Sequence, residues 1–276
     1  MPEYRDQALL LGLQGLALLR GAIDGTDGFI AARTHEMREV LAEPEPPGKP
    51  VADLDVSMGY ASLAAAYDSE PDAFIQVEEP VVRAFTDGLP TGTALDAACG
   101  TGRHAAALLA RGHDVTGVDQ SAEMLDRARA KAPKARLLQG DLTALPLPGD
   151  TVDLAVCGLA LSHLPDIVPA IRELARVTRP GGRVIITDVH PTMTALRGTF
   201  LFRHDDRLGR IRNHAHPVSS YLAAFAAAGL DVEQCAEPES NGTLPPHGYE
   251  RRYPDAARAA WAGLPFVLAW RLRVRG

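Results

Sequence analysis

The middle of the chain alternates between short apolar runs and longer stretches that are apolar along one side only. The short runs have the length of buried strands, and the longer stretches have helical spacing. The pattern predicts strands that begin at Thr93 and that cover 114–118, 135–139, 152–157 and 183–189. It predicts helices over 103–111, from Ser121 onward and over 167–178. Strands that alternate with helices form a parallel sheet with right-handed crossovers, so we expect an α/β domain.

The regular pattern loosens after Val189. Residues 200–212 alternate around a polar tip and predict a hairpin. A helix over 218–228 and strands over 230–235 and 265–274 are expected after it. The remaining connections are long for a compact domain, and connections of that length often carry function.

The N-terminal region is dominated by residues 8–19, the most apolar run of the chain. This run is too short to span a bilayer, and it predicts a helix that the main domain or a second subunit must cover. A second, less regular helix is expected before the proline-rich segment 43–50. We therefore divide the chain into an N-terminal helical extension with its linker, 1–50, and a main domain, 51–276. The extension is expected to form a homodimer contact or a lid.

Composition narrows the classes of partner. The 276 residues are 46% hydrophobic and 23% charged, as in ordinary globular proteins, and the net charge is −7. Without a block of lysine and arginine, binding to a nucleic-acid backbone is not expected, so a small-molecule substrate is favoured. The three cysteines lie far apart in the sequence, which suits a reducing, cytoplasmic compartment better than disulfides or a zinc site. We expect no targeting segment and no membrane contact.

The segment Thr93–His104, TALDAACGTGRH, has the pattern of a strand, a tight glycine turn and a helix start. Backbone N–H groups at such a turn can approach a ligand closely. Gly100–Ala105 satisfies the G-x-G-x-x-G/A dinucleotide pattern, and Asp119 stands where a ribose-binding acid belongs. An NAD-dependent oxidoreductase is therefore one hypothesis. Asp96, four residues before the first glycine of the turn, is not part of that pattern.

The longer string Asp96–Gly102 resembles the D-x-G-x-G-x-G signature of class I S-adenosylmethionine-dependent methyltransferases, with Ala98 in place of the first glycine. Glu173–Gly182 resembles the segment that leads into the fifth strand of that family, and Tyr60–Asp68 resembles its lid. The resemblance implies a Rossmann-like, seven-stranded, mostly parallel sheet with helices on both faces and the last strand inserted antiparallel. It divides the main domain into a lid segment, 51–90, a core, 91–191, and substrate-side insertions, 192–217 and 237–264.

The same resemblance implies S-adenosylmethionine as the cofactor. Asp96 would orient its amino-acid end, Asp119 would accept hydrogen bonds from both ribose hydroxyls, and Asp141 would accept from the adenine amine. Met124 would pack on the adenine, although core packing explains it nearly as well. Cys157 is interpreted as a small lining residue and not as a nucleophile, because no activating base is evident. The expected cofactor contacts are Tyr67, Asp96, Ala98, Gly100, Gly102, Asp119, Gln120, Met124, Asp141, Leu142 and Cys157.

Methyl transfer to a hydroxyl group needs a base that works near neutral pH, which favours histidine. The candidates are His163, after the fourth strand, His190, after the fifth, and His216, in the insertion before the last predicted helix. Asp188 and His190 together could hold Mg²⁺, but two ligands are too few to assign a metal site.

The leading hypothesis is a methyltransferase for a small-molecule acceptor, such as a natural product or a glycan precursor, at oxygen. Transfer to nitrogen or carbon and a protein that binds S-adenosylmethionine without transferring methyl groups remain alternatives. Asp96 and Asp141 disfavour the oxidoreductase. At the start of the predicted helix, Arg103 could meet a carboxylate, and His104 is expected to face solvent.

Overall fold

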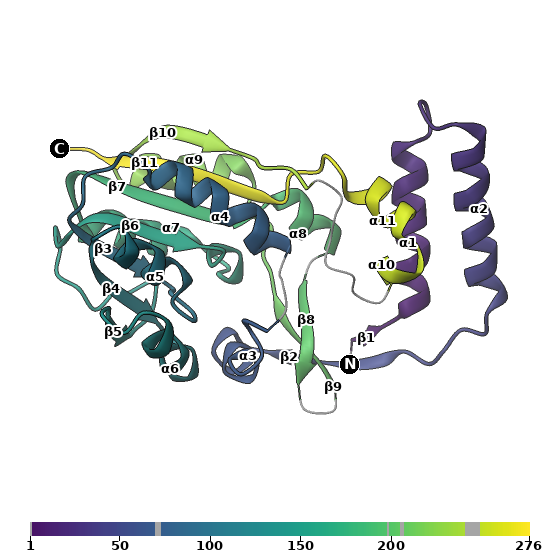
Figure 1. Ribbon diagram of the computed structural model, residues 1–276, viewed down its shortest axis with the longest axis horizontal. Helices are drawn as coiled ribbons and strands as arrows, with labels where there is room; N and C mark the ends of the chain where they lie inside the picture. Colours follow the sequence, from purple (N-terminus) through teal and green to yellow (C-terminus); the bar gives the residue numbers. More distant parts are fainter. Residues whose placement is uncertain (1, 70–72, 198, 205–206, 241–248) are drawn as a thin grey trace.

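The computed structural model describes residues 2–69, 73–197, 199–204, 207–240 and 249–276 (Figure 1). Its main element is a seven-stranded sheet in the order β10-β11-β7-β6-β3-β4-β5. β11 runs antiparallel to both neighbours, and the other adjacent pairs are parallel. The predicted fold class and the antiparallel last strand are confirmed. The strands are β3 (Thr93–Ala97), β4 (Asp114–Asp119), β5 (Arg136–Gln139), β6 (Val152–Gly158), β7 (Thr178–Val189), β10 (Leu230–Ala236) and β11 (Val267–Val274).

Helices cover both faces of this sheet (Figure 1). One core cluster joins Leu95 of β3 to α7 (Val168–Val177) and α9 (Val218–Ala227). A second cluster joins Ala94 of the same strand to α4 (Ala73–Thr86) and α5 (Arg103–Ala110). Successive residues of a strand point to opposite faces, so one strand supplies both cores. α6 (Ala122–Lys131) follows β4 and packs against β4 and β5.

The strand order reverses between β3 and β6. From β3 the chain continues to β4 and β5 on one side, and from β6 it continues to β7 on the other. Open α/β sheets bind their ligands beyond the carboxyl ends of the strands at such a reversal. The glycine turn follows β3 directly, so it lies at the place where this fold offers a site.

A second, four-stranded sheet has the order β1-β2-β9-β8. The predicted hairpin is confirmed as β8 (Thr199–His204) and β9 (Arg207–Arg212), which pair antiparallel. β1 (Glu3–Tyr4) and β2 (Lys49–Leu54) come from the N-terminal region, and β2 was not predicted. β2 pairs in parallel with β9, so the extension and the distant insertion form one sheet.

α3 (Val56–Leu63) lies on this small sheet, and Gly59 allows the close approach. A Cβ atom at Gly59 would lie 2.5 Å from the side chain of Ile211 in β9. The small sheet therefore supports the predicted lid segment through α3.

The extension folds as two helices, α1 (Asp6–Arg20) and α2 (Asp27–Ala42). Leu10, Leu13 and Ala17 of α1 are buried in the same core cluster as α11 (Pro254–Trp261). The apolar side of α1 is thus covered by its own chain. The remaining elements are η1 (Leu161–His163), α8 (Pro191–Arg197) and α10 (Tyr249–Arg252). No helix in the described part of the chain combines the length and the apolar character needed to cross a membrane.

Candidate functional site

The glycine turn between β3 and α5 uses left-handed backbone at three positions. Ala98, Gly100 and Gly102 have φ values of 56°, 51° and 83°. A Cβ at Gly100 would meet no atom within 4 Å, whereas one at Gly102 would lie 3.1 Å from the Cβ of Ala128 in α6. Gly100 therefore faces open space that a ligand can approach, and Gly102 permits close packing of α5 on α6. Ala98 carries backbone strain, because its side chain disfavours a positive φ.

Asp96 lies under this turn and is 1% exposed. Its Oδ2 accepts a hydrogen bond of 2.7 Å from the Ala105 N–H, and its Oδ1 has no partner among the described residues. Burial raises the pKa of Asp96 to about 6, against the opposing effects of His104 and the Ala105 N–H. A buried carboxylate oxygen without a donor is costly, so a cation or donor that reached Oδ1 would be stabilised there.

Asp119 ends β4 beside the turn. Its Oδ2 accepts from the Gly100 N–H at 2.8 Å, and its Oδ1 accepts from the Ser121 N–H at 2.9 Å. Burial raises the pKa of Asp119, although these backbone donors counteract the shift. Each oxygen retains acceptor capacity, as ribose recognition requires. Gln120 is exposed, and the side-chain amide of Gln139 donates to its carbonyl oxygen.

The other expected cofactor contacts differ in exposure. Asp141 is exposed, and its Oδ1 accepts from the backbone N–H and hydroxyl of Thr143, while Leu142 is half-buried. Met124 is 1% exposed, so it belongs to the core. The Cys157 side chain is fully buried, and burial raises its thiol pKa, in keeping with an unreactive residue.

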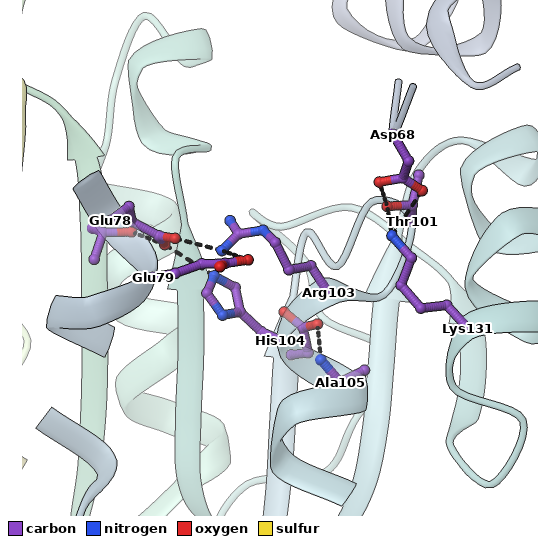
Figure 2. Close-up of polar contacts among 10 residues, drawn as sticks. Asp68, Glu78, Glu79, Thr101, Arg103, His104, Ala105 and Lys131 are labelled. Atoms are coloured by element: carbon purple, nitrogen blue, oxygen red, sulfur yellow. Dashed lines mark hydrogen bonds and ion pairs between the residues drawn. The ribbon is translucent and has the colours of Figure 1, made fainter. Parts of the chain in front are cut away.

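The lid segment reaches the turn through Asp68. Asp68 accepts a hydrogen bond of 3.0 Å from the Thr101 hydroxyl and forms an ion pair of 2.7 Å with Lys131 at the end of α6 (Figure 2). Tyr67 is half-buried, and its ring centroid lies 6.0 Å from that of Tyr60 in α3. The segment that follows α3 is therefore fixed beside the glycine turn.

His163 is the candidate base that meets the lid. Its Nε2 lies 2.7 Å from the Tyr60 hydroxyl, and the two rings contact edge to face. Burial lowers the pKa of His163 to about 4, and the backbone of Arg212 and the side chain of Asn213 offset only part of this shift. The imidazole is therefore neutral at pH 7, the form that can accept a proton.

Both ring nitrogens of His190 and one of His216 already form hydrogen bonds within the protein. The Thr192 N–H at the start of α8 donates to Nδ1 of His190, and Nε2 of His190 donates to Glu237 at 3.1 Å. Nε2 of His216 donates to the carbonyl of Leu164 at 2.8 Å.

The pair that was considered for Mg²⁺ is also engaged elsewhere. Asp188 is fully buried and accepts a hydrogen bond of 2.5 Å from the Tyr221 hydroxyl. Within the described ranges, no three His, Cys, Asp or Glu side chains are grouped as ligands for a metal ion.

A buried charge cluster beside the turn was not predicted. Glu78 of α4 is 0% exposed, with its Oε1 2.9 Å from Nε2 of His104 and its Oε2 2.5 Å from a guanidinium nitrogen of Arg103 (Figure 2). The Thr187 hydroxyl of β7 donates to Oε1 at 2.7 Å. Burial alone would raise the pKa of Glu78, but His104 and Arg103 outweigh it and lower the pKa to about 2. The expectation that His104 faces solvent is wrong: it is 8% exposed and pairs with Glu78.

Comparison with known proteins agrees with this geometry. Residues 95–186 match the family model described as a methyltransferase domain. A malonyl-[acyl-carrier protein] O-methyltransferase of Serratia marcescens is 33% identical over 132 residues, which are 48% of this chain and 51% of that protein. A demethylmenaquinone methyltransferase of Streptomyces avermitilis is 32% identical over 151 residues, which are 53% of this chain and 65% of that protein.

Solved structures show the same fold. An S-adenosylmethionine-dependent methyltransferase from Mesorhizobium loti has a TM-score of 0.54 at 24% identity and covers 71% of this chain and 97% of that one. Residues 95–186 therefore form a methyltransferase domain, and the main sheet around them has the fold of class I S-adenosylmethionine-dependent methyltransferases. The chain spans about half the length of the first curated relative and just under two thirds of the second.

Proposed function

We propose that this chain transfers a methyl group from S-adenosylmethionine to an oxygen atom of a small molecule. The observation that carries the proposal is the contact of 2.7 Å between His163 and Tyr60, next to the glycine turn. A neutral imidazole and a hydroxyl group at the carboxyl ends of the strands are suited to remove a proton from an acceptor.

The cofactor is held, in this proposal, by residues on both sides of the strand reversal. Asp119 and Asp141 bind the ribose and the adenine, and the unpartnered oxygen of Asp96 faces the amino-acid end. When bound, S-adenosylmethionine supplies an electrophilic methyl group on its sulfonium sulfur. The protein's part is to hold the acceptor oxygen in line with that methyl group and to exclude water.

His163 acts as the base. Its proton affinity is low because it is buried, so it gains a proton only as the acceptor oxygen forms its new bond. The proton arrives through Tyr60, whose hydroxyl gives its own proton to Nε2 and takes that of the acceptor. Tyr60 orients the imidazole through the bond to Nε2, and α3 with its small sheet fixes Tyr60. The kinetic consequence is an acid limb of kcat/KM near pH 4 for this group, well below that of an exposed histidine.

The acceptor is a small molecule or a small group on a carrier. The two named relatives differ in this respect, one acting on a malonyl group of an acyl-carrier protein and the other on demethylmenaquinone. Transfer to nitrogen would not depend on His163 in the same way, because a neutral amine attacks through its own lone pair. Transfer to carbon also needs a base, so the methylated product must be identified to separate carbon from oxygen, and the dependence on His163 separates oxygen from nitrogen.

The test uses S-adenosylmethionine, a panel of hydroxyl, carboxyl and amine compounds, and detection of S-adenosylhomocysteine. We expect turnover with a hydroxyl acceptor, a fall in kcat of roughly 10²- to 10⁴-fold in His163→Gln, and unchanged affinity for S-adenosylhomocysteine. His35→Gln, an exposed histidine on α2, is the matched control. Turnover with an amine alone, unaffected by His163→Gln, would contradict the proposal.

We further propose that the chain works in the cytoplasm and forms a homodimer through its N-terminal helices. Leu19 and Ile23 near the tip of the α1–α2 hairpin are 74% and 94% exposed, which supports a protein contact. Light scattering should give a dimer that Ile23→Glu converts to a monomer. A monomeric wild-type protein would rule the contact out.

A further inference from the structure

The charge cluster around Glu78 lies where the cofactor's amino-acid end must be. The residues proposed for ribose and adenine follow β4 and β5, on one side of the strand reversal. The opposite end of the cofactor therefore lies over β3 and β6, at the reversal itself. Gly158 ends β6 there, and a Cβ on it would lie 2.6 Å from Nε2 of His104 and 2.8 Å from Oε1 of Glu78. The cluster thus directly borders this part of the site.

Arg103 is the partly exposed member of the cluster. It follows Gly102 as the first residue of α5, and its side chain is 23% exposed, whereas that of Glu78 is completely buried. Arg103 therefore lies at the partly exposed edge of a cluster whose carboxylate is buried.

The guanidinium retains hydrogen-bonding capacity. One terminal nitrogen contacts Glu78 at 2.5 Å and Glu79 at 3.6 Å. Among the described residues, the other two nitrogens of Arg103 have no hydrogen-bond partner. A planar guanidinium can pair with a second carboxylate through its remaining N–H groups.

We propose that Arg103 binds the carboxylate of the cofactor's methionine end and that Glu78 is the positioning residue that holds the guanidinium there. This inference rests on the proposed function. The same end of the cofactor carries an ammonium group, for which the unpartnered Oδ1 of Asp96 is the counterpart. Arg103 then binds the carboxylate of the amino-acid end, and Asp96 binds its ammonium group.

Glu78 acts on Arg103 by geometry. The negative charge of Glu78 reduces the attraction between the Arg103 guanidinium and a second anion. If charge alone mattered, removing the charge of Glu78 would strengthen binding of the cofactor's carboxylate. Its contacts with His104, Thr187 and Arg103 come from α5 and β7, and they fix the guanidinium in one place. The two effects predict opposite changes in affinity, which makes the role testable.

The experiment compares S-adenosylhomocysteine with 5′-deoxy-5′-methylthioadenosine, which lacks the amino-acid end, by calorimetric titration. Wild-type protein should bind the first at least tenfold more tightly. Arg103→Gln should weaken S-adenosylhomocysteine roughly 10- to 100-fold and leave methylthioadenosine within about twofold. Arg103→Lys keeps the positive charge but loses the planar guanidinium group. Its affinity for S-adenosylhomocysteine should therefore lie between those of the wild-type protein and Arg103→Gln. Arg111→Gln, at the other end of α5 and paired with Asp87, is the control and should change neither ligand.

Glu78→Gln should weaken S-adenosylhomocysteine roughly three- to tenfold, with methylthioadenosine again unchanged. A gain in affinity for S-adenosylhomocysteine would overturn the positioning role. Equal losses for both ligands in Arg103→Gln, or none, would overturn the role of Arg103 while the proposed function stands. If wild-type protein binds neither ligand, the proposed function itself fails.

Discussion

Replacing Asp119 with asparagine removes one negative charge from the end of β4 and keeps the shape of the side chain. The carboxylate now accepts N–H bonds of 2.8 Å from Gly100 and 2.9 Å from Ser121. An asparagine side chain offers one oxygen to these two donors, and its amide nitrogen would face the other. The substitution therefore affects both the turn and the proposed ribose contact.

The expected magnitudes follow from the cost of each lost bond. A buried N–H group left without an acceptor costs about 1–3 kcal/mol of folding stability. Loss of a charge-assisted bond to the ribose costs about 1.5–3 kcal/mol of binding free energy, or roughly 10- to 150-fold in Kd. Both effects should appear together, because Asp119 serves both partners.

Calorimetric titration with S-adenosylhomocysteine measures the affinity, and thermal unfolding measures the stability. Asp126→Asn is the matched control, since Asp126 lies on α6, pairs with Arg129, and has a 72% exposed side chain. It should leave the affinity within about twofold. A folded Asp119→Asn protein with wild-type affinity would refute the ribose assignment.

Three further predictions concern stability and assembly. Ala98→Gly should stabilise the protein by about 1 kcal/mol in denaturant unfolding, because the φ of 56° suits glycine. A loss of stability would contradict the claim that the backbone is strained at Ala98. The pKa of Glu78 is lowered to about 2 in the folded protein. Ionised Glu78 therefore contributes about 3 kcal/mol to the free energy of unfolding above pH 4.5, and this contribution is lost as the pH falls toward 2. Glu78→Gln should flatten that part of the stability–pH curve, and an unchanged curve would mean that the carboxylate is not ionised. Deleting residues 1–43 exposes the face of α11 that α1 covers, so the truncated protein should lose solubility or cofactor affinity; a monodisperse product with unchanged affinity would show that the extension is dispensable.

The main sheet is predictable from the sequence because its strands are buried on both faces. The run in β6, for example, is apolar apart from Asp153, and the turns between such runs are marked by glycine. β2 carries no such signal. It contains Lys49 and Pro50 at the end of a proline-rich segment, and it becomes a strand through pairing with β9, more than 150 residues away in the sequence.

The residues proposed to bind the cofactor could be named from the glycine turn and the strand ends, whereas the charge cluster could not be predicted. Glu78 and Glu79 form a charged pair of the kind that usually faces solvent. A helical signal was nevertheless present, because Glu78 lies four residues before Val82 and seven before Phe85, the buried face of α4. The partners of Glu78 come from α5 and β7, and only the tertiary structure brings them together.

The central claim is that the glycine turn holds S-adenosylmethionine and not a dinucleotide. It is tested most directly by calorimetric titration of the wild-type protein with S-adenosylhomocysteine and with NAD in parallel. Micromolar binding of S-adenosylhomocysteine, without binding of NAD, is the predicted result. Binding of NAD alone would contradict the assignment of Asp96, Asp119 and Asp141 and the function built on it.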